Sequence, residues 1–107
     1  TEPTLSGKHD LTRVAELTRH FEIPALVCVN KWDINPEITA AIETEAQELG
    51  LGLAGRVRYD RAVTEAQVQG QTITEYQKNG CAADIRQAWN LIEQSLIKIR
   101  QAAPTPL

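Results

Sequence analysis

The chain has 107 residues, of which 42% are hydrophobic and 23% charged, and its formal net charge is −3. This length allows one domain or part of one, and the composition excludes disorder over most of the chain. Because Lys and Arg form no cluster and no apolar run approaches the roughly 20 residues that span a bilayer, we expect no direct nucleic-acid binding and no membrane segment. The two cysteines lie in no CxxC pair, which favours reduced thiols and a cytoplasmic location.

The first predicted element is a helix from Asp10 to about Phe21, with apolar side chains on one face and charged ones on the other. Its apolar positions are Leu11, Val14, Ala15, Leu17 and Phe21. Before it, Pro3, Ser6 and Gly7 predict a turn that follows the end of a preceding element. The chain also begins without Met, which suggests a processed or excised piece. We therefore expect a helix with one buried face close to the start of the sequence.

A buried strand and a capped helix follow. The continuous apolar run from Ala25 to Val29 is typical of a parallel strand that is covered on both faces. Asn35 and Pro36 then predict the start of a second helix, and Gly50 predicts its end. The apolar positions of this helix are Ile38, Ala41, Ile42, Ala46 and Leu49. Their spacing predicts a helix that packs one face on the strand.

The second half of the chain predicts another strand and further helices. The apolar stretch 51–57 is the strand, and a short helix is expected to follow it to Gln69. Residues 72–76 are expected to be extended or irregular, and the last helix is expected to end near Arg100. Its apolar positions are Ile85, Ala88, Trp89, Ile92, Leu96 and Ile99. Residues 101–107 are expected to form a flexible tail.

This order of elements predicts an α/β fold, with a parallel sheet flanked by helices. A sheet of only two strands is thin, because parallel sheets normally bury both faces and contain several strands. The predicted strand pair has apolar, unpaired edges, which suggests that it belongs to a larger sheet whose other strands are absent.

The sharpest motif is Asn30-Lys31-Trp32-Asp33, directly after the first strand, at the carboxyl end where open α/β sheets bind ligands. An Asn side chain both donates and accepts hydrogen bonds and can read a purine edge, whereas an Asp carboxylate can accept two N–H groups of guanine. The aliphatic part of Lys31 can cover a base face. The alternative is a polar turn in which Asp33 or Asn35 caps the next helix.

Two further motifs are candidates for a ligand site. Arg58-Tyr59-Asp60 ends the second strand, so it should share a crevice with the first motif; Tyr59 can stack on a base, and capping of the next helix is the simpler role for Asp60. The stretch Pro3-Thr4-Leu5-Ser6-Gly7, which leads into His9 and Asp10, is predicted as a strand-to-helix turn whose free N–H groups can face an anion, or it is only a capped helix start.

The cysteines and histidines show no metal-binding pattern. Cys28 and Cys81 lie far apart and in no CxxC pair, so we expect reduced thiols that pack as small hydrophobes and no iron–sulfur cluster in this chain. Cys81 follows Gly80 at a helix start, a position that can lower a thiol pKa, although packing is the favoured role. His9 and His20 are interpreted as surface residues, and no GxxxxGKT-like phosphate loop occurs.

Several short motifs occur in register along the chain. They are Glu2-Pro3-Thr4, Gly7 with His9-Asp10, Asn30-Lys31-Trp32-Asp33, Gly55-Arg56-Val57 with Tyr59-Asp60, Glu65-Ala66 and Gln69-Gly70. In this order and spacing they resemble the C-terminal half of the MinD/ParA family of P-loop ATPases, and most of all a MinD-superfamily branch with an inserted iron–sulfur ferredoxin domain. The resemblance covers residues 1 to about 76. It implies that residues 1–100 are the C-terminal portion of a doubly wound, three-layer P-loop NTPase domain without its N-terminal strands and phosphate loop.

The resemblance also implies ligands and partners. ATP is the implied nucleotide, with Mg²⁺ in the complete domain, and its base is bound by Asn30, Lys31, Asp33 and the turn Arg58-Tyr59-Asp60. The chain departs from the family at Arg58, where proline is usual. Ser6, Gly7 and Asp10 match positions near the ATP-dependent dimer interface or switch. The implied partners are the missing N-terminal half and a second copy, as a homodimer or an edge-mediated oligomer, and no hydrolysis is expected from this chain alone.

Two alternatives stay open. The chain can be a non-catalytic interaction module of the same fold that pairs with another protein through an exposed sheet edge. It can also be part of a GTP-binding protein, because the pattern Asn30-Lys31-Trp32-Asp33 matches the guanine-specifying motif of GTPases.

Overall fold

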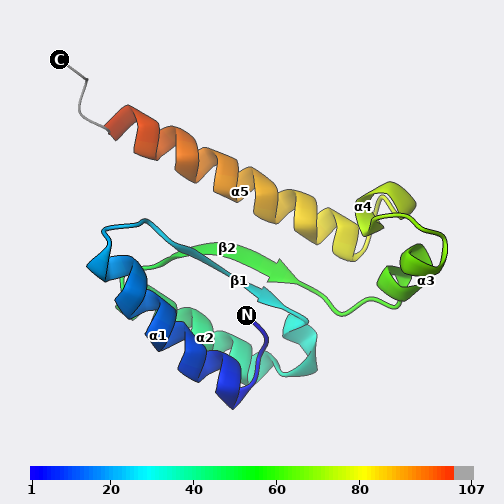
Figure 1. Cartoon of the computed structure of the whole chain (residues 1–107). Coiled ribbons are helices and arrows are strands. Elements are labelled where there is room, and N and C mark those ends of the chain that lie inside the picture. Colours follow the sequence, from blue (N-terminus) through cyan, green and yellow to red (C-terminus); the bar gives the residue numbers. More distant parts are fainter. Residues whose placement is uncertain (103–107) are drawn as a thin grey trace.

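The computed structural model describes residues 1–102 and has a mixed α/β architecture with a two-stranded parallel sheet (Figure 1). Its elements are α1 (Leu5–His20), β1 (Leu26–Asn30), the short 3₁₀ helix η1 (Trp32–Ile34), α2 (Pro36–Glu48), β2 (Gly52–Val57), α3 (Ala62–Val68), α4 (Ile73–Tyr76) and α5 (Cys81–Ala102). The predicted α/β class and parallel strand pair are therefore confirmed. No helix in the described part of the chain is both long and apolar enough to cross a membrane.

Helix α1 begins at Leu5, well before the predicted start at Asp10. Thr4 is its N-cap, because the Thr4 hydroxyl accepts a hydrogen bond of 2.9 Å from the Gly7 N–H. The predicted turn at Ser6 and Gly7 is therefore wrong, and both residues lie inside the helix. Gly7 is there because the chain start crosses it closely: a Cβ at this position would overlap the Glu2 carbonyl oxygen.

Only part of the apolar face of α1 is buried. Leu11 and Ala15 are 5% and 3% exposed, but Val14 and Leu17 on the same helix, and Phe21 at its C-cap, are all more than half exposed. The helix packs on α2 and covers little of the sheet directly. The hydrophobic pattern therefore marked the apolar face correctly, whereas the expectation that the whole face is buried is wrong.

The core lies between α1, α2 and one face of the sheet. Val27 and Val29 point from β1 into it, and Ile42 and Ala46 meet them from α2. The strands run in parallel register from Leu26 opposite Gly52 to Asn30 opposite Val57, with a bulge beside Cys28. Asn35 accepts a 3.0 Å hydrogen bond from the Ile38 N–H, which confirms the predicted cap of α2, and Gly50 ends the segment with φ of +80°.

Helix α5 packs on β2 from the side opposite α1 and α2, and α3 and α4 gather beyond the carboxyl ends of the strands (Figure 1). The radius of gyration is 15.8 Å, whereas a compact domain of about 100 residues has a radius near 13 Å. The described part of the chain is therefore more extended than an ordinary domain of its size, and α5 leaves Trp89 and Ile97 more than half exposed.

Residues 72–76 were expected to be extended or irregular, and this expectation is wrong. They contain α4, which begins with a capping box: the Thr72 hydroxyl caps the Glu75 N–H, and the Glu75 carboxylate binds back to Thr72. Helix α5 continues through Ala102, so the first two residues of the expected flexible tail are helical, and residues 103–107 lie outside the described part of the chain.

Candidate functional site

A cavity of about 370 Å³ lies at the carboxyl ends of β1 and β2, and we call it the strand-end cavity. The turns after the two strands form one side of it, and α3, α4 and α5 form the other. Its lining residues are Asn30, Lys31, Val57, Arg58, Tyr59, Asp60, Val63, Thr64, Ile73, Cys81 and Ile85. Five of the six predicted base-binding residues therefore meet at a single cavity, as expected for parallel strands that end at one edge.

The turn after β1 is tightly held. Lys31 adopts a left-handed conformation with φ of 56°, and its Nζ lies 3.3 Å from a Glu2 carboxylate oxygen. Behind the turn, the buried Thr39 hydroxyl lies 3.0 Å from the Trp32 carbonyl oxygen and ties η1 to α2. Asn30 is exposed at the end of β1. Asn30, which lines the cavity, therefore lies at the start of a turn that these contacts hold in place.

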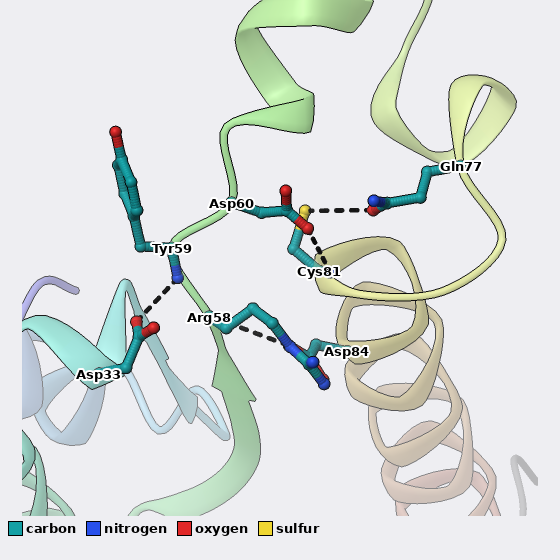
Figure 2. Close-up of polar contacts among 7 residues, drawn as sticks. All are labelled: Asp33, Arg58, Tyr59, Asp60, Gln77, Cys81 and Asp84. Atoms are coloured by element: carbon teal, nitrogen blue, oxygen red, sulfur yellow. Dashed lines mark hydrogen bonds and ion pairs between the residues drawn. The ribbon is translucent and has the colours of Figure 1, made fainter.

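Asp33 is the predicted base-binding residue that does not line the strand-end cavity. Its Oδ1 accepts a hydrogen bond of 2.8 Å from the Tyr59 N–H, which joins the turn after β1 to the turn after β2 (Figure 2). Asp33 instead lines the neighbouring larger cavity, together with Arg56 and Asp84. The sequence suggested base reading or helix capping for Asp33, and the structure shows a third role, which is to connect the two turns.

Arg58 is fixed to α5 rather than free in the cavity. Its Nε and Nη2 donate hydrogen bonds of 2.7 and 2.9 Å to the two carboxylate oxygens of Asp84, and its backbone N–H donates a third of 3.1 Å (Figure 2). The Arg58 guanidinium holds the pKa of Asp84 below its usual range. A proline, the residue that the resemblance led us to expect here, would lack both the guanidinium and the N–H. Arg58 therefore attaches α5 to the end of β2 through contacts that proline could not make.

Asp60 joins α3 to the start of α5. Its Oδ1 accepts from the Ala62 N–H at 2.9 Å. Its Oδ2 accepts from the Cys81 N–H at 3.2 Å, as Figure 2 shows. These two N–H donors lower the pKa of the Asp60 carboxyl, because they stabilise its charged form. Asp60 precedes Arg61, the N-cap residue of α3, and no side chain caps that helix, so Asp60 holds the turn before α3 rather than capping it; the contact with α5 was not predicted.

The lowered pKa values of Asp60 and Asp84 predict acid lability. Each carboxylate contributes stability above its unfolded pKa of about 3.9, and this stability is lost as the pH falls through the lower folded pKa. We expect the thermal unfolding temperature to decrease when the pH is lowered below about 4. Melting curves between pH 6 and pH 2 measure this, and Asp60→Asn should flatten the acid part of the profile. Asp10→Asn, on the exposed surface of α1, is the matched control; an equal effect of both variants would contradict the assignment.

Several cavity residues were not predicted from the sequence. Val63 and Thr64 come from α3, Ile73 from α4, and Cys81 and Ile85 from the first turns of α5. The Cys81 side chain is 1% exposed, and burial raises the pKa of its thiol. The thiol therefore packs as a small apolar group, which confirms the favoured interpretation of Cys81. The same cause raises the pKa of the half-buried Cys28 thiol.

The larger cavity measures about 620 Å³ and lies between β2, α2 and α5. Four of its charged side chains are paired with one another: Arg56 contacts Glu43 at 2.5 Å and lies 5.0 Å above the Trp32 ring, and Arg58 is bound to Asp84. The fifth, Asp33, accepts the Tyr59 N–H. The two ion pairs are therefore already neutralised within the chain and offer little free binding potential for a charged ligand.

Ser6, Gly7 and Asp10 do not join the strand-end cavity. They lie in the N-terminal turns of α1, where Ser6 and Asp10 are exposed and Gly7 is half-buried beneath the first residues of the chain. His9 and His20 are also exposed on α1. The predicted nucleotide site and the predicted dimer or switch residues thus occupy separate parts of the molecule.

Within residues 1–102, no three His, Cys, Asp or Glu side chains are placed to hold a metal ion. Comparisons of the chain with protein-family models, with curated proteins and with solved structures found no match.

Proposed function

We propose that this chain is the C-terminal, base-binding part of a MinD/ParA-type ATPase domain, which contacts the adenine base of ATP. The observation that carries the proposal is that Asn30 and the turn from Arg58 to Asp60 line one cavity, although they are far apart in the sequence. That cavity lies at the carboxyl ends of two adjacent parallel strands, the position at which open α/β sheets bind ligands.

The chemistry of the strand-end cavity suits a nucleotide base. Its volume of about 370 Å³ is at the lower end of the range of roughly 300–1,000 Å³ for small-molecule sites. Val57, Ile73 and Ile85 supply apolar walls for a flat ring, and Asn30 supplies one donor and one acceptor for its edge. The Tyr59 ring is 53% exposed and available for stacking at the rim.

The position of Asp33 favours adenine over guanine. A guanine-reading carboxylate must face the base, but the Asp33 carboxylate accepts the Tyr59 N–H and lies outside the strand-end cavity. Rotating it toward the cavity would leave the Tyr59 N–H without this partner, at a cost of about 1–3 kcal/mol if that group stays dry. ATP is therefore the proposed nucleotide.

Hydrolysis would need groups that the strand-end cavity does not provide. Phosphoryl transfer depends on positioning the phosphates and neutralising their charge, usually with Mg²⁺, and the cations beside this cavity are engaged with carboxylates: Lys31 with Glu2 and Arg58 with Asp84. We propose that a phosphate-binding half supplies these groups, and that the exposed Ser6 and Asp10 on α1 contribute to pairing of two such domains.

Titrations of the ¹⁵N-labelled chain with adenosine, ATP and GTP test the proposal by NMR. We expect shifts at the amides of Asn30 and Tyr59 and a dissociation constant in the millimolar range, about −4 kcal/mol, because base contacts alone are weak. Adenosine and ATP should bind equally well, since only the base is held. Asn30→Ala should weaken binding roughly tenfold, or about 1.4 kcal/mol, by removing the edge contacts.

Asn90→Ala is the matched control, because Asn90 is exposed on α5 and does not line the cavity. Equal binding by the Asn30 and Asn90 variants would contradict the base-binding role. ATP binding far more tightly than adenosine would show that the chain contacts phosphates, and tighter binding of GTP would support the guanine-binding alternative.

A non-catalytic interaction module is the second candidate. The observation in its favour is the amount of exposed apolar surface, which includes Leu5, Phe21, Val68 and Trp89, each more than half exposed. This candidate predicts a stable oligomer without nucleotide, which sedimentation or size-exclusion measurements detect.

A further inference from the structure

Residues 61–80 leave the sheet after β2 and return at the start of α5, and we call this segment the α3–α4 arm. Its two helices pack on each other, and α4 also packs on α5 (Figure 1). The buried cluster of the core, by contrast, takes its residues from α1, β1 and α2. Within the arm only two small side chains, Ala62 and Ala66, are buried. Movement of the arm away from α5 would therefore expose little apolar surface.

The two ends of the α3–α4 arm are tied to each other. Asp60 precedes the arm and Cys81 follows it, and Oδ2 of Asp60 accepts from the Cys81 N–H at 3.2 Å (Figure 2). Gly80, with φ of +67°, makes the sharp return into α5. Inside the arm, the Tyr76 hydroxyl donates to a Glu65 carboxylate oxygen at 3.1 Å and joins α4 to α3. A segment that is closed at its base and braced inside can move as one body without disturbing β2 or α5.

Arg86 of α5 holds the α3–α4 arm from outside its base. Its Nη1 donates to the Lys78 carbonyl oxygen at 2.8 Å, and its Nη2 donates to the carbonyl oxygens of Thr74 and Gln77 at 2.8 and 3.2 Å. These oxygens lie in the last turn of α4 and directly after it, where carbonyls have no partner within the helix and a cation is favoured. Because Arg86 is exposed, water competes for the same hydrogen bonds, and the attachment is reversible.

The α3–α4 arm forms part of the wall of the strand-end cavity that lies opposite the two strand turns. It contributes Val63, Thr64 and Ile73, and Cys81 lies at its base with a side chain that is only 1% exposed. The Gln77 Oε1 lies 4.0 Å from the Cys81 Sγ, so the arm contacts this thiol directly (Figure 2). Movement of the arm would therefore open the cavity and uncover Cys81 at the same time.

We propose that the α3–α4 arm is a lid that opens and closes over the strand-end cavity, and that Arg86 is the latch that holds it closed. Arg86 does not line the cavity, so it acts through the arm and is a positioning residue rather than a ligand contact. The movement follows from hydrogen bonds and packing alone. Its consequence, that the arm controls the entry of a nucleotide base, rests on the proposed function.

Labelling of Cys81 with a neutral thiol reagent tests the latch, with Cys28 as the internal reference. Arg86→Ala should speed the reaction of Cys81 about tenfold relative to Cys28, because it removes the hydrogen bonds that hold the arm closed. Arg86→Lys keeps the charge but loses the planar fork that reaches three carbonyls, so its rate should lie between the two. Arg100→Ala is the matched control, because Arg100 is exposed on the same helix and does not line the cavity; it should leave the rate unchanged.

Amide hydrogen exchange measured by NMR separates movement of the arm from its unfolding. The Gln71 N–H donates to the Ala66 carbonyl oxygen at 2.9 Å inside the arm, so its exchange should be unchanged in Arg86→Ala while Cys81 reacts faster. An unchanged Cys81 rate in the folded Arg86 variants would overturn the proposal. Equal acceleration of Cys81 labelling and Gln71 exchange would also overturn it, because the arm would then unfold instead of opening.

Adenosine separates this proposal from the proposed function. A base held beneath the closed arm should slow the labelling of Cys81 in the unsubstituted chain, and Arg86→Ala should weaken adenosine binding severalfold, because part of the cavity is then open more often. Faster labelling of Cys81 in Arg86→Ala, together with no effect of adenosine on either protein, would support the lid and contradict base binding.

Discussion

Replacing Ile42 with alanine should lower the free energy of unfolding by about 3–4 kcal/mol. Ile42 is fully buried in the cluster formed with Leu11, Val27, Val29 and Ala46, which joins α1, α2 and the sheet. The substitution removes apolar surface and leaves a cavity that rigid neighbours fill only in part. Because a domain of this size is stable by only about 5–15 kcal/mol, the loss is a large share of the total.

Denaturant unfolding followed by circular dichroism measures this loss, and the melting temperature should fall by roughly 15 °C or more. Ile97→Ala is the matched control: it removes the same atoms from α5, but Ile97 is 53% exposed, so the expected change is about 0.5 kcal/mol or less. Equal losses for the two variants would show that the cluster around Ile42 does not dominate the stability of the fold.

Local signals in the sequence were sufficient for the centre of the fold. Asn35, Pro36 and Gly50 each impose a backbone requirement at one place, so α2 was predicted nearly to the residue. The apolar run of β1 was predicted within one residue, but the expectation that both faces of the strand are covered is wrong: Val27 and Val29 are buried, whereas Leu26 is 37% exposed. Their order predicted the parallel pairing, and with it the meeting of the Asn30 and Tyr59 turns.

The apolar face of a helix could be predicted from the sequence, but the burial of that face could not. The spacing of apolar residues shows which face of a helix is apolar, but it does not show whether a partner covers that face. On α1 the same stripe includes the buried Leu11 and the exposed Leu17. Short elements were also missed: α4 depends on the reciprocal contacts of Thr72 and Glu75, a pattern too brief to produce periodicity.

Of the residues that line the candidate site, only those in the turns after the two strands were predicted. The strand turns carry a positional signal, because strand ends of a parallel sheet converge. Thr64, Ile73 and Ile85 reach the same cavity from helices whose placement depends on long-range contacts. Those contacts are carried by Asp84 and Asp60, which bind partners 26 and 21 residues away, and a single sequence gives no local indication of such pairs.

Substitution of Gly80 by alanine adds a single methyl group, which should detach the start of α5 from the strand-end cavity. Its φ is +67°, and an added Cβ would lie 2.5 Å from Oδ2 of Asp60, the oxygen that accepts from the Cys81 N–H. Gly80→Ala therefore combines left-handed strain with displacement of this carboxylate. We expect a loss of about 2–3 kcal/mol, of which about 1–2 is backbone strain and about 1 the lost helix cap.

Gly70→Ala separates these two causes. Gly70 has the same φ of +67°, but nothing lies within 4 Å of its added Cβ, so only the strain remains. The difference between the two variants therefore measures the contacts of the added Cβ with Asp60 and with Gln77, whose Oε1 and Nε2 would lie 3.0 and 3.1 Å from it. Most of the difference should disappear when both variants are made in an Asp60→Ala background. An undiminished difference in that background would show that Asp60 does not connect the two segments.

Thiol reactivity gives a second, local measurement of the same event. Cys81 is 1% exposed and follows Gly80 directly, so release of the α5 start should expose its thiol. Its reaction with a neutral thiol reagent should be faster in Gly80→Ala than in Gly70→Ala, while Cys28 serves as an internal reference in both. If the strand-end cavity binds the base, Gly80→Ala should also weaken adenosine binding more than Gly70→Ala does, because Cys81 and Ile85 form part of the wall that moves.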